Sequence, residues 1–319
     1  MSFSGTYVEA VRQALFDAME ADPRVCCLGE DIGAYGGAFR ATEGLLERFG
    51  ADRVIDTPIA EQAIAGAAIG AALMGQRPVA EFQFMDFALL ASDLMVNFAA
   101  KAHWRWGASV PAVFRGPAGG GNGGGPFHSQ NPEGHFLGSP GLKVVAPGTV
   151  RDAYALLRAA IEDPDPVLVF EHKHLYRRLK DQWDEAPTAR LGEAALRRDG
   201  ASACIITYGA AQHVALEAVA NLDVAVLDLR TLWPLDDEAI ATLAKRTHRV
   251  LVFTEAPRTY GPGAELAARI GESCFAWLDA PVLRVGAADT PTPASPPLEA
   301  ACLPGPSRVR SELERLLAW

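Results

Sequence analysis

Cysteine is scarce and unpatterned in this sequence, and motifs that mark two common classes of hydrolase are missing. The five cysteines contain no Cys-x-x-Cys pair and no metal-ligand spacing, and their odd number argues against a complete disulfide framework. There is no Gly-x-Ser-x-Gly elbow and no His-Glu-x-x-His helix. These absences exclude a disulfide-stabilised secreted domain and both hydrolase types, and the cysteine usage favours a reducing cytoplasm.

Long apolar runs and basic clusters are also lacking. The most apolar stretch, 63–74, has about a dozen residues, whereas a membrane-spanning helix needs ~20. The opening residues have no basic start followed by an apolar core, so they predict a first helix and not a signal peptide. The formal net charge of -10 comes from scattered acidic residues, which suits a basic protein partner better than nucleic acid. We expect a soluble cytoplasmic protein that binds neither membrane nor nucleic acid.

Short β-branched runs alternate with helical patterns along the chain, which predicts an α/β fold with parallel sheets covered by helices on both faces. The length of 319 residues favours two domains. The polar stretch 178–188 is the best linker, so we place a first domain at 1–187 and a second at 188–319. Strands are expected at 25–28, 79–82, 111–114, 143–145, 167–170, 203–208, 224–229 and 250–254, and helices at 210–220 and 236–246 and from Thr6, Pro58, Phe87 and Val150.

One helix start carries a carboxylate in an unusual place. Thr57 can cap a helix whose first residue is Pro58, and Glu61 then falls in its first turns. An isolated Glu there would most often serve only the helix dipole. The helix that follows is too apolar for a solvated surface helix, however. If Glu61 is buried there, we expect its carboxylate to have a chemical function.

The same apolar helix contains Gly66 and Gly70 on adjacent turns. Small residues at this spacing let another backbone approach closely, either within the fold or at a subunit interface. In the next helix Asp93, Asn97 and Lys101 recur every four residues, which suggests a buried polar network at an interface.

The loop 116–128 holds seven glycines, too many for one tight turn. A phosphate-binding role is disfavoured, because no Gly-Lys-Ser/Thr and no helix follows. The composition favours a mobile active-site loop that delivers the turn at His128. From spacing alone a single histidine there is more often incidental.

Together these segments resemble the beta chain of the thiamine-diphosphate-dependent decarboxylating component of 2-oxoacid dehydrogenase complexes. Similar blocks include GEDIGAYGGAFRATEGL, DTPIAEQAIAGAAIGAAL, EFQFMDF, HSQNPEGHF, PGLKVVAP, DPVLVFEHKHLY and TLWPLD, so the similarity covers nearly the whole chain. It implies a transketolase-like pyrimidine-binding domain followed by a transketolase C-terminal-like domain.

The resemblance also implies roles for individual residues. A glutamate at the place of Glu61 bonds the aminopyrimidine ring of thiamine diphosphate and exchanges a proton with it. Phe87 would stack on that ring, Ile59 would line its pocket, and His128 would act near the substrate. Some relatives bind potassium at positions that correspond here to Ala112, Ala160, Ile161, Asp163 and Asp165, the last of which replaces the usual asparagine.

A motif of this enzyme class is absent. The Gly-Asp-Gly and Asn-Asn segments that bind the diphosphate and Mg²⁺ do not occur. The resemblance therefore implies that a separate alpha subunit holds these groups, in an alpha-two beta-two heterotetramer.

The expected activity is oxidative decarboxylation of a 2-oxoacid, with acyl transfer to lipoyl-lysine on an acyltransferase core. Details of the glycine-rich loop and of the LPGPSRV ending favour branched-chain substrates such as 2-oxoisovalerate. Pyruvate or acetoin dehydrogenase and a split transketolase-like transferase are the alternatives, and a non-catalytic scaffold is a further one.

Overall fold

The computed structural model describes residues 2–319, which divide into two compact units. Unit 1 comprises the chain up to Ala118 together with His135–Leu191, and unit 2 comprises Gly119–Gly134 and Gly192–Trp319. The chain thus passes from one unit to the other four residues after the expected boundary at 187. The glycine-rich segment belongs with unit 2, although it lies within the first half of the sequence.

Unit 1 is built on a parallel sheet. Its strands follow the order β6-β7-β5-β4-β2-β3, and every pairing among them is parallel. Its elements are β1 (Phe3–Thr6), α1 (Tyr7–Ala21), β2 (Val25–Glu30), α2 (Leu45–Phe49), β3 (Val54–Thr57), α3 (Glu61–Leu73), β4 (Arg77–Glu81), η1 (Met85–Ala91), η2 (Leu94–Ala99), α4 (Ala100–Trp106), β5 (Val113–Ala118), α5 (Gly134–Leu137), β6 (Lys143–Val145), α6 (Val150–Glu162), β7 (Val167–His172) and β8 (Lys180–Trp183).

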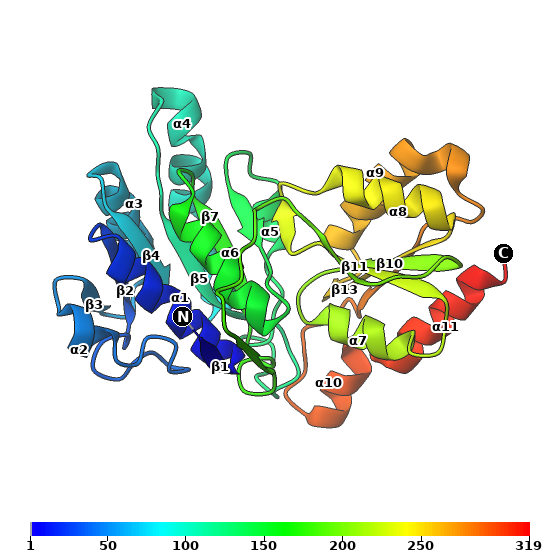
Figure 1. Cartoon of the computed structure of the whole chain (residues 1–319), viewed down its shortest axis with the longest axis horizontal. Coiled ribbons are helices and arrows are strands. Elements are labelled where there is room, and N and C mark those ends of the chain that lie inside the picture. Colours follow the sequence, from blue (N-terminus) through cyan, green and yellow to red (C-terminus); the bar gives the residue numbers. More distant parts are fainter. Residues whose placement is uncertain (1) are drawn as a thin grey trace. The chain divides into compact units, whose positions relative to one another are not determined.

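Helices cover this sheet because parallel strands need crossover connections. Helix α1 packs against α6 (Figure 1). Helix α3 packs against β4, η1 and η2. The start of α1 is fixed by a capping box, in which the Thr6 side chain accepts from the backbone of Glu9 and the Glu9 side chain accepts from the backbone of Thr6. The helix starts expected at Thr6 and Val150 are therefore confirmed within one residue.

Two local expectations in unit 1 are wrong. The stretch 178–188 is not simply a linker, because β8 pairs antiparallel with β1 and the Trp183 ring stacks on Phe3 at a centroid distance of 4.1 Å. Thr57 does not cap a helix, because it ends β3 in register with Glu30 of β2. Helix α3 begins only at Glu61, after a short loop. Pairing between strands distant in sequence decided both points.

The helix expected from Phe87 is more irregular than its sequence suggests. It begins at Met85 as the 3-10 helix η1 and continues through the π-helical η2 into α4. Asp93, Asn97 and Lys101 form a chain of hydrogen bonds, with Asn97 Nδ2 donating to Asp93 Oδ1 at 2.7 Å and Lys101 Nζ donating to Asn97 Oδ1 at 2.8 Å. All three side chains are exposed in this chain, so the expected network exists but is not buried within unit 1.

Unit 2 contains a second sheet, of strand order β14-β13-β10-β11-β9, in which only β9 runs antiparallel. Helices α7 and α11 lie on one side of the strands and α8 and α9 on the other (Figure 1). Its elements are β9 (Ala195–Arg198), β10 (Ala203–Thr207), α7 (Ala211–Ala218), β11 (Val224–Asp228), β12 (Thr231–Trp233), α8 (Asp237–Thr247), β13 (Val250–Pro257), α9 (Pro262–Cys274), η3 (Phe275–Trp277), β14 (Leu283–Ala287), α10 (Pro296–Cys302) and α11 (Pro306–Leu317).

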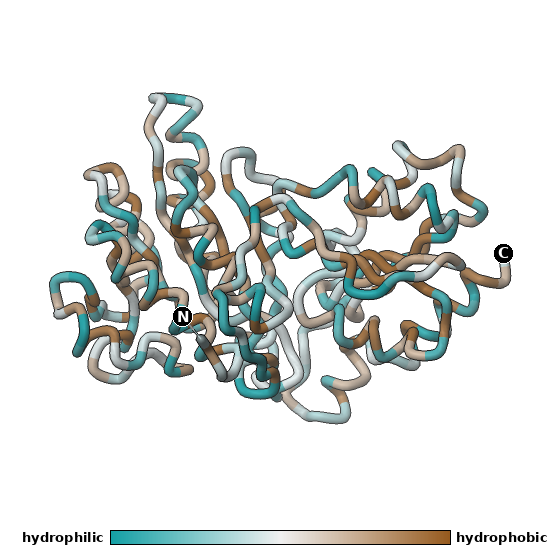
Figure 2. The backbone as a smooth tube through the Cα atoms, in the orientation of Figure 1, coloured by the Kyte–Doolittle hydropathy of each residue, from teal (hydrophilic) through white to brown (hydrophobic). Residues whose placement is uncertain are grey.

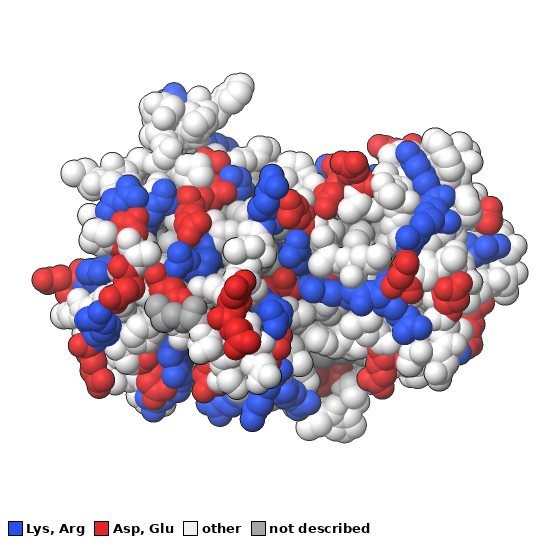
Figure 3. All heavy atoms as spheres, viewed as in Figure 1, with Lys and Arg blue, Asp and Glu red and all other residues white. Residues whose placement is uncertain are grey.

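The strands of both sheets carry the most hydrophobic residues, as Figure 2 shows for the central strands of unit 2. In that unit Ile205, Val226 and Phe253 pack with Val309 and Leu313 of α11 in one buried cluster. Charged side chains of both signs are interspersed over the face seen in Figure 3. Among residues 2–319, no helix is long and apolar enough to cross a membrane.

Candidate active site

Three polar residues end neighbouring strands at the carboxyl edge of the unit 1 sheet. Strands β2, β3 and β4 finish at Glu30, Thr57 and Glu81, and Glu30 is in register with Thr57. In open parallel sheets this edge is where ligands bind. Helix α3 follows β3, so its first residue, Glu61, starts from the same edge. Glu61 is only 7% exposed.

Glu61 occupies the first turn of α3, as expected, although the helix begins at Glu61 itself and not at Pro58. The residue before the helix is Ala60, whose side chain provides no cap. The backbone N–H groups of that first turn favour a negative charge nearby. This geometry accommodates both the helix-dipole role and a role in chemistry.

Two buried oxygen atoms at this edge lack hydrogen-bond partners within residues 2–319, namely Glu30 Oε1 and Thr57 Oγ1. Burial, reinforced by the nearby Glu61 and Asp31 carboxylates, raises the pKa of Glu30. Unsatisfied buried polar atoms are rare in folded proteins and carry a cost. A ring with both donor and acceptor nitrogens, such as an aminopyrimidine, would supply the missing partners. The residues present therefore fit the pyrimidine end of thiamine diphosphate.

Apolar side chains accompany these carboxylates. Ile59 lies in the loop before α3 and is 80% exposed. Phe87, in η1, is half-buried, and its ring meets that of Phe84 edge to face at 6.1 Å. Since α3 packs against η1, Glu61 and Phe87 lie on adjoining elements of one unit. The stacking and lining roles assigned to Phe87 and Ile59 remain predictions.

A buried ion cluster lies farther along the same edge, and sequence reasoning missed it. Arg115 of β5 donates from Nη2 to Glu171 Oε2 at 2.7 Å and also contacts Glu81. Tyr176 donates to the same Glu171 oxygen at 2.7 Å. Burial raises the pKa of Glu81 although Arg115 opposes this shift. The signal available in the sequence was a lone arginine within an apolar strand run, since buried arginines are nearly always paired.

His128 belongs to unit 2. Its backbone N–H donates to the Gly125 carbonyl at 3.3 Å, so a turn ends at His128, whereas the sequence suggested one that begins there; the side chain is half-buried. The glycine-rich loop is held in place, because several of its backbone amides donate hydrogen bonds to carboxylates of unit 2. A catalytic role for His128 remains a prediction.

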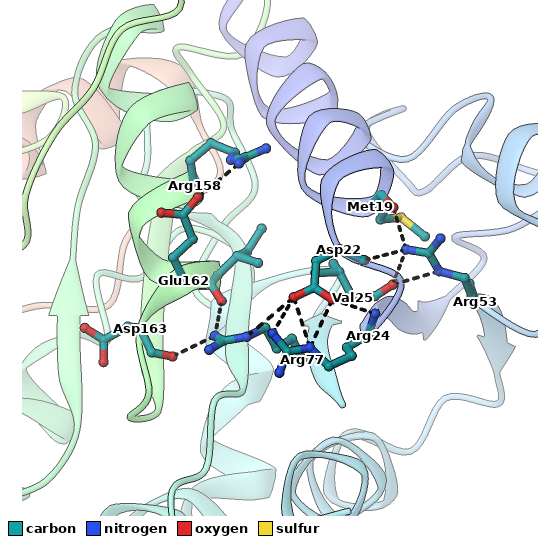
Figure 4. A network of polar contacts seen from close by, with 10 residues as sticks. Met19, Asp22, Arg24, Val25, Arg53, Arg77, Arg158, Glu162 and Asp163 are labelled. Carbon is teal, nitrogen blue, oxygen red and sulfur yellow. Dashed lines mark hydrogen bonds and ion pairs between the residues drawn. The ribbon is translucent and has the colours of Figure 1, made fainter. Parts of the chain in front are cut away.

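The oxygens expected to bind potassium already have cationic partners within the chain. Arg77 Nη1 donates to the Ile161 carbonyl at 2.7 Å. It also donates to the Asp163 carbonyl at 3.2 Å (Figure 4). Lys143 Nζ lies 2.7 Å from Asp163 Oδ1 and 3.1 Å from Asp165 Oδ2. Two fixed positive charges at these oxygens oppose a third.

The remaining expected ligands, Ala112 and Ala160, also accept backbone hydrogen bonds. The Ala112 carbonyl accepts from Val167 at 3.0 Å, and the Ala160 carbonyl accepts from Asp163 at 3.3 Å. The cationic partners of Ile161, Asp163 and Asp165 disfavour a potassium ion here, and binding of the ion at the five expected positions remains a prediction.

Comparison with known protein families agrees with this architecture. Residues 4–178 match the transketolase pyrimidine binding domain, and residues 192–309 match the transketolase C-terminal domain. A solved structure, "Split gene transketolase, inactive beta4 tetramer", superposes with a TM-score of 0.82 at 20% identity and covers 98% of this chain and 99% of that one. At this identity the likeness shows the fold alone, and it confirms the expected pair of α/β domains.

Three curated relatives are much closer in sequence. The chain is 44% identical to 2-oxoisovalerate dehydrogenase subunit beta of Bacillus subtilis, covering 98% of both chains. It is 45% identical to 3-methyl-2-oxobutanoate dehydrogenase subunit beta of Mycobacterium tuberculosis, covering 98% of this chain and 92% of the relative. It is 40% identical to pyruvate dehydrogenase E1 component subunit beta-4 of Oryza sativa, covering 97% and 79%. The chain therefore belongs to the family of 2-oxoacid dehydrogenase beta subunits, which are thiamine-dependent and transketolase-like.

Proposed function

We propose that this chain is the beta half of an enzyme that oxidatively decarboxylates a branched-chain 2-oxoacid and transfers the acyl group to lipoyl-lysine on an acyltransferase. The observation that carries the proposal is the buried Glu61, which lies near Glu30 at the carboxyl edge of the sheet, where Thr57 is in register with Glu30. The names of the two relatives at 44% and 45% identity favour 2-oxoisovalerate over pyruvate, whose relative is 40% identical.

Thiamine diphosphate, when bound, supplies the electron sink for decarboxylation. Glu61 would hold and exchange a proton through its carboxyl oxygens at the pyrimidine ring, in a setting largely screened from water. Glu30 and Thr57 would orient the ring through the two oxygens that now lack partners. Ile59 and Phe87 would provide its apolar walls.

A second chain is needed for the rest of the cofactor, and the surface of α3 offers a place for one. The exposed side of this helix carries Ala63, Ala67 and Gly70; its last residue, Leu73, is 43% exposed, and Met74, which follows it, is 84% exposed. On the adjoining helices Leu90 is 63% exposed, beside the polar chain from Asp93 to Lys101. Small and apolar residues at a surface favour close contact with another subunit. We infer that the alpha subunit, which would hold the diphosphate and Mg²⁺, joins this chain in an alpha-two beta-two assembly.

The decisive experiment compares the chain alone with the chain reconstituted with its alpha subunit. Alone, it should bind thiamine diphosphate negligibly and decarboxylate nothing, because it lacks the diphosphate-binding motif. Reconstituted, it should turn over 2-oxoisovalerate faster than pyruvate in a panel of 2-oxoacids. Tight calorimetric binding of the cofactor to the isolated chain would refute the half-enzyme proposal.

A matched pair of glycine variants sharpens this test. A side chain added at Gly70 of α3 or at Gly271 of α9 meets nothing within 4 Å, so both sites tolerate a larger residue within the chain itself. We use Gly70→Arg to block the α3 surface and Gly271→Arg as its control in unit 2. Only Gly70→Arg should prevent reconstitution, as measured by size-exclusion chromatography.

The His128→Ala variant should separate the two half-reactions. Opening the lipoyl disulfide requires a proton for the departing sulfur, which an imidazole can supply, whereas decarboxylation depends mainly on the cofactor. Transfer to a lipoyl acceptor should fall about 100-fold or more, the usual scale for a proton donor. Decarboxylation, measured on the same preparation with an artificial electron acceptor and at equal cofactor occupancy, should fall much less. Equal losses in both assays would instead indicate a positioning role.

Potassium should have no specific effect on this protein. Arg77 and Lys143 already contact oxygens of Ile161, Asp163 and Asp165, three of the five expected ligands. Melting temperature and turnover should therefore be the same in KCl and NaCl at equal ionic strength. A bound ion at 100 times its dissociation constant would stabilise the fold by about 2.7 kcal/mol, so a clear rise of the melting temperature in KCl would contradict this assignment.

A further inference from the structure

The backbone of the glycine-rich segment has a repeating conformation. Gly119, Gly121, Gly123 and Gly125 have φ values of 80°, 84°, 68° and 71°, in the left-handed region that other residues avoid, and they alternate with residues outside it. Such alternation can turn neighbouring N–H groups toward a common side and form a concave nest for an anion. This explains why so many glycines are needed over so short a stretch.

Carboxylates of the same unit fill this nest. The backbone N–H groups of Gly121 and Gly123 donate to Glu299 Oε1 and Oε2 at 2.8 and 3.0 Å. The N–H group of Gly120 donates to Glu255 Oε1 at 2.8 Å. Glu299 is 5% exposed, so its carboxyl group is largely shielded from water while it accepts hydrogen bonds from these amides. The segment therefore binds side chains of its own chain where a phosphate-binding loop would bind a ligand.

The residues that follow the nest are also held by hydrogen bonds to residues of unit 2. Asn131 Nδ2 donates to Glu255 Oε1 at 3.2 Å, and the Tyr208 hydroxyl donates to buried Glu133. A side chain at Gly124 would come within 2.8 Å of the His128 carbonyl oxygen. The backbone around His128 is thus packed directly against the nest that Glu299 fills.

We propose that Glu299 is a positioning residue, whose carboxylate locks the glycine nest and thereby fixes the place of His128. This inference rests on the proposed function of His128 in acyl transfer. Glu299 lies in α10, about 170 residues further along the sequence, and it would act through the backbone of the segment without touching the substrate. Without the carboxylate, the segment would become the mobile loop that its composition suggests.

Hydrogen exchange tests the lock directly. In Glu299→Gln the side chain keeps its size but offers one acceptor oxygen in place of two. Exchange at the amides of Gly121 and Gly123 should accelerate about tenfold or more, on the scale of a lost charge-assisted hydrogen bond. Glu272→Gln, an exposed change in α9 of the same unit, is the control and should leave these amides unchanged. Unchanged exchange in Glu299→Gln, in a chain that melts at the normal temperature, would overturn the proposal.

A double-mutant cycle on the reconstituted enzyme tests the link to His128. If Glu299 acts through His128, Glu299→Gln should lower kcat for transfer to the lipoyl acceptor in the parent enzyme and cause no further loss in His128→Ala. Additive losses would mean that Glu299 serves activity by another route, and the positioning role would fail. If His128→Ala alone has no effect, the proposed function of His128 fails and the positioning role with it, whereas the exchange result still decides whether Glu299 locks the segment.

Discussion

Glu61→Gln should leave the reconstituted enzyme assembled and reduce its turnover by about 100- to 10,000-fold, the range that positioned proton transfer contributes. The amide keeps the shape of the side chain and its acceptor oxygen, but it cannot exchange a proton with the pyrimidine ring. The loss should fall on kcat in both the lipoyl and the artificial-acceptor assays, since proton exchange at the cofactor precedes both.

The alternative is a purely structural role for Glu61, in which it interacts with the N-terminus of α3. Such an interaction contributes about 0.3–1 kcal/mol to stability and nothing to turnover. Glu47→Gln provides the matched control, because Glu47 is an exposed carboxylate in the first turn of α2 in the same unit. Near-normal turnover in Glu61→Gln, with a small stability change like that of Glu47→Gln, would show that Glu61 interacts only with the helix dipole and has no catalytic role.

Arg115→Met should be the most destabilising single change at the carboxyl edge. It removes the guanidinium that joins Glu81 to Glu171 and leaves two buried carboxyl groups without their counter-charge. Removing one partner of a buried ion cluster costs about 3–5 kcal/mol. For a unit of this size, that loss lowers the melting temperature by about 6 °C or more.

The pH dependence of this loss has a definite sign. Burial already raises the pKa of Glu81, and without Arg115, which lowers it, the folded-state pKa should rise further above the unfolded value. A group with a raised folded pKa binds protons more tightly in the folded state, so the variant should regain stability relative to the parent as pH falls. Arg24→Met, the control, removes an exposed pair with Asp22 and should cost little stability. A similarly small, pH-independent loss in Arg115→Met would show that the buried cluster contributes little.

The sequence determined most of the strand and helix pattern. Apolar runs such as 203–208 and 224–229 form buried strands because few polar groups interrupt them, and the structure places β10 and β11 there within one residue. The position of Glu61 at the start of an apolar helix was also readable, since a carboxylate so placed is conspicuous in a single chain. The family itself was recognisable from ordered blocks of residues along nearly the whole chain.

Only the tertiary structure decided which distant residues meet. Arg115 joins Glu81 and Glu171 because β5 lies between β4 and β7 in the sheet, and no local pattern records that arrangement. The glycine-rich segment looks mobile by composition, since glycine costs most entropy to order. It is held by Glu299, which is distant in sequence and reaches the segment only in the folded unit. Hydrogen bonds between segments so far apart depend on the packing of the whole unit. The sequence by itself could therefore indicate the glycine-rich loop but not the carboxylate that holds it.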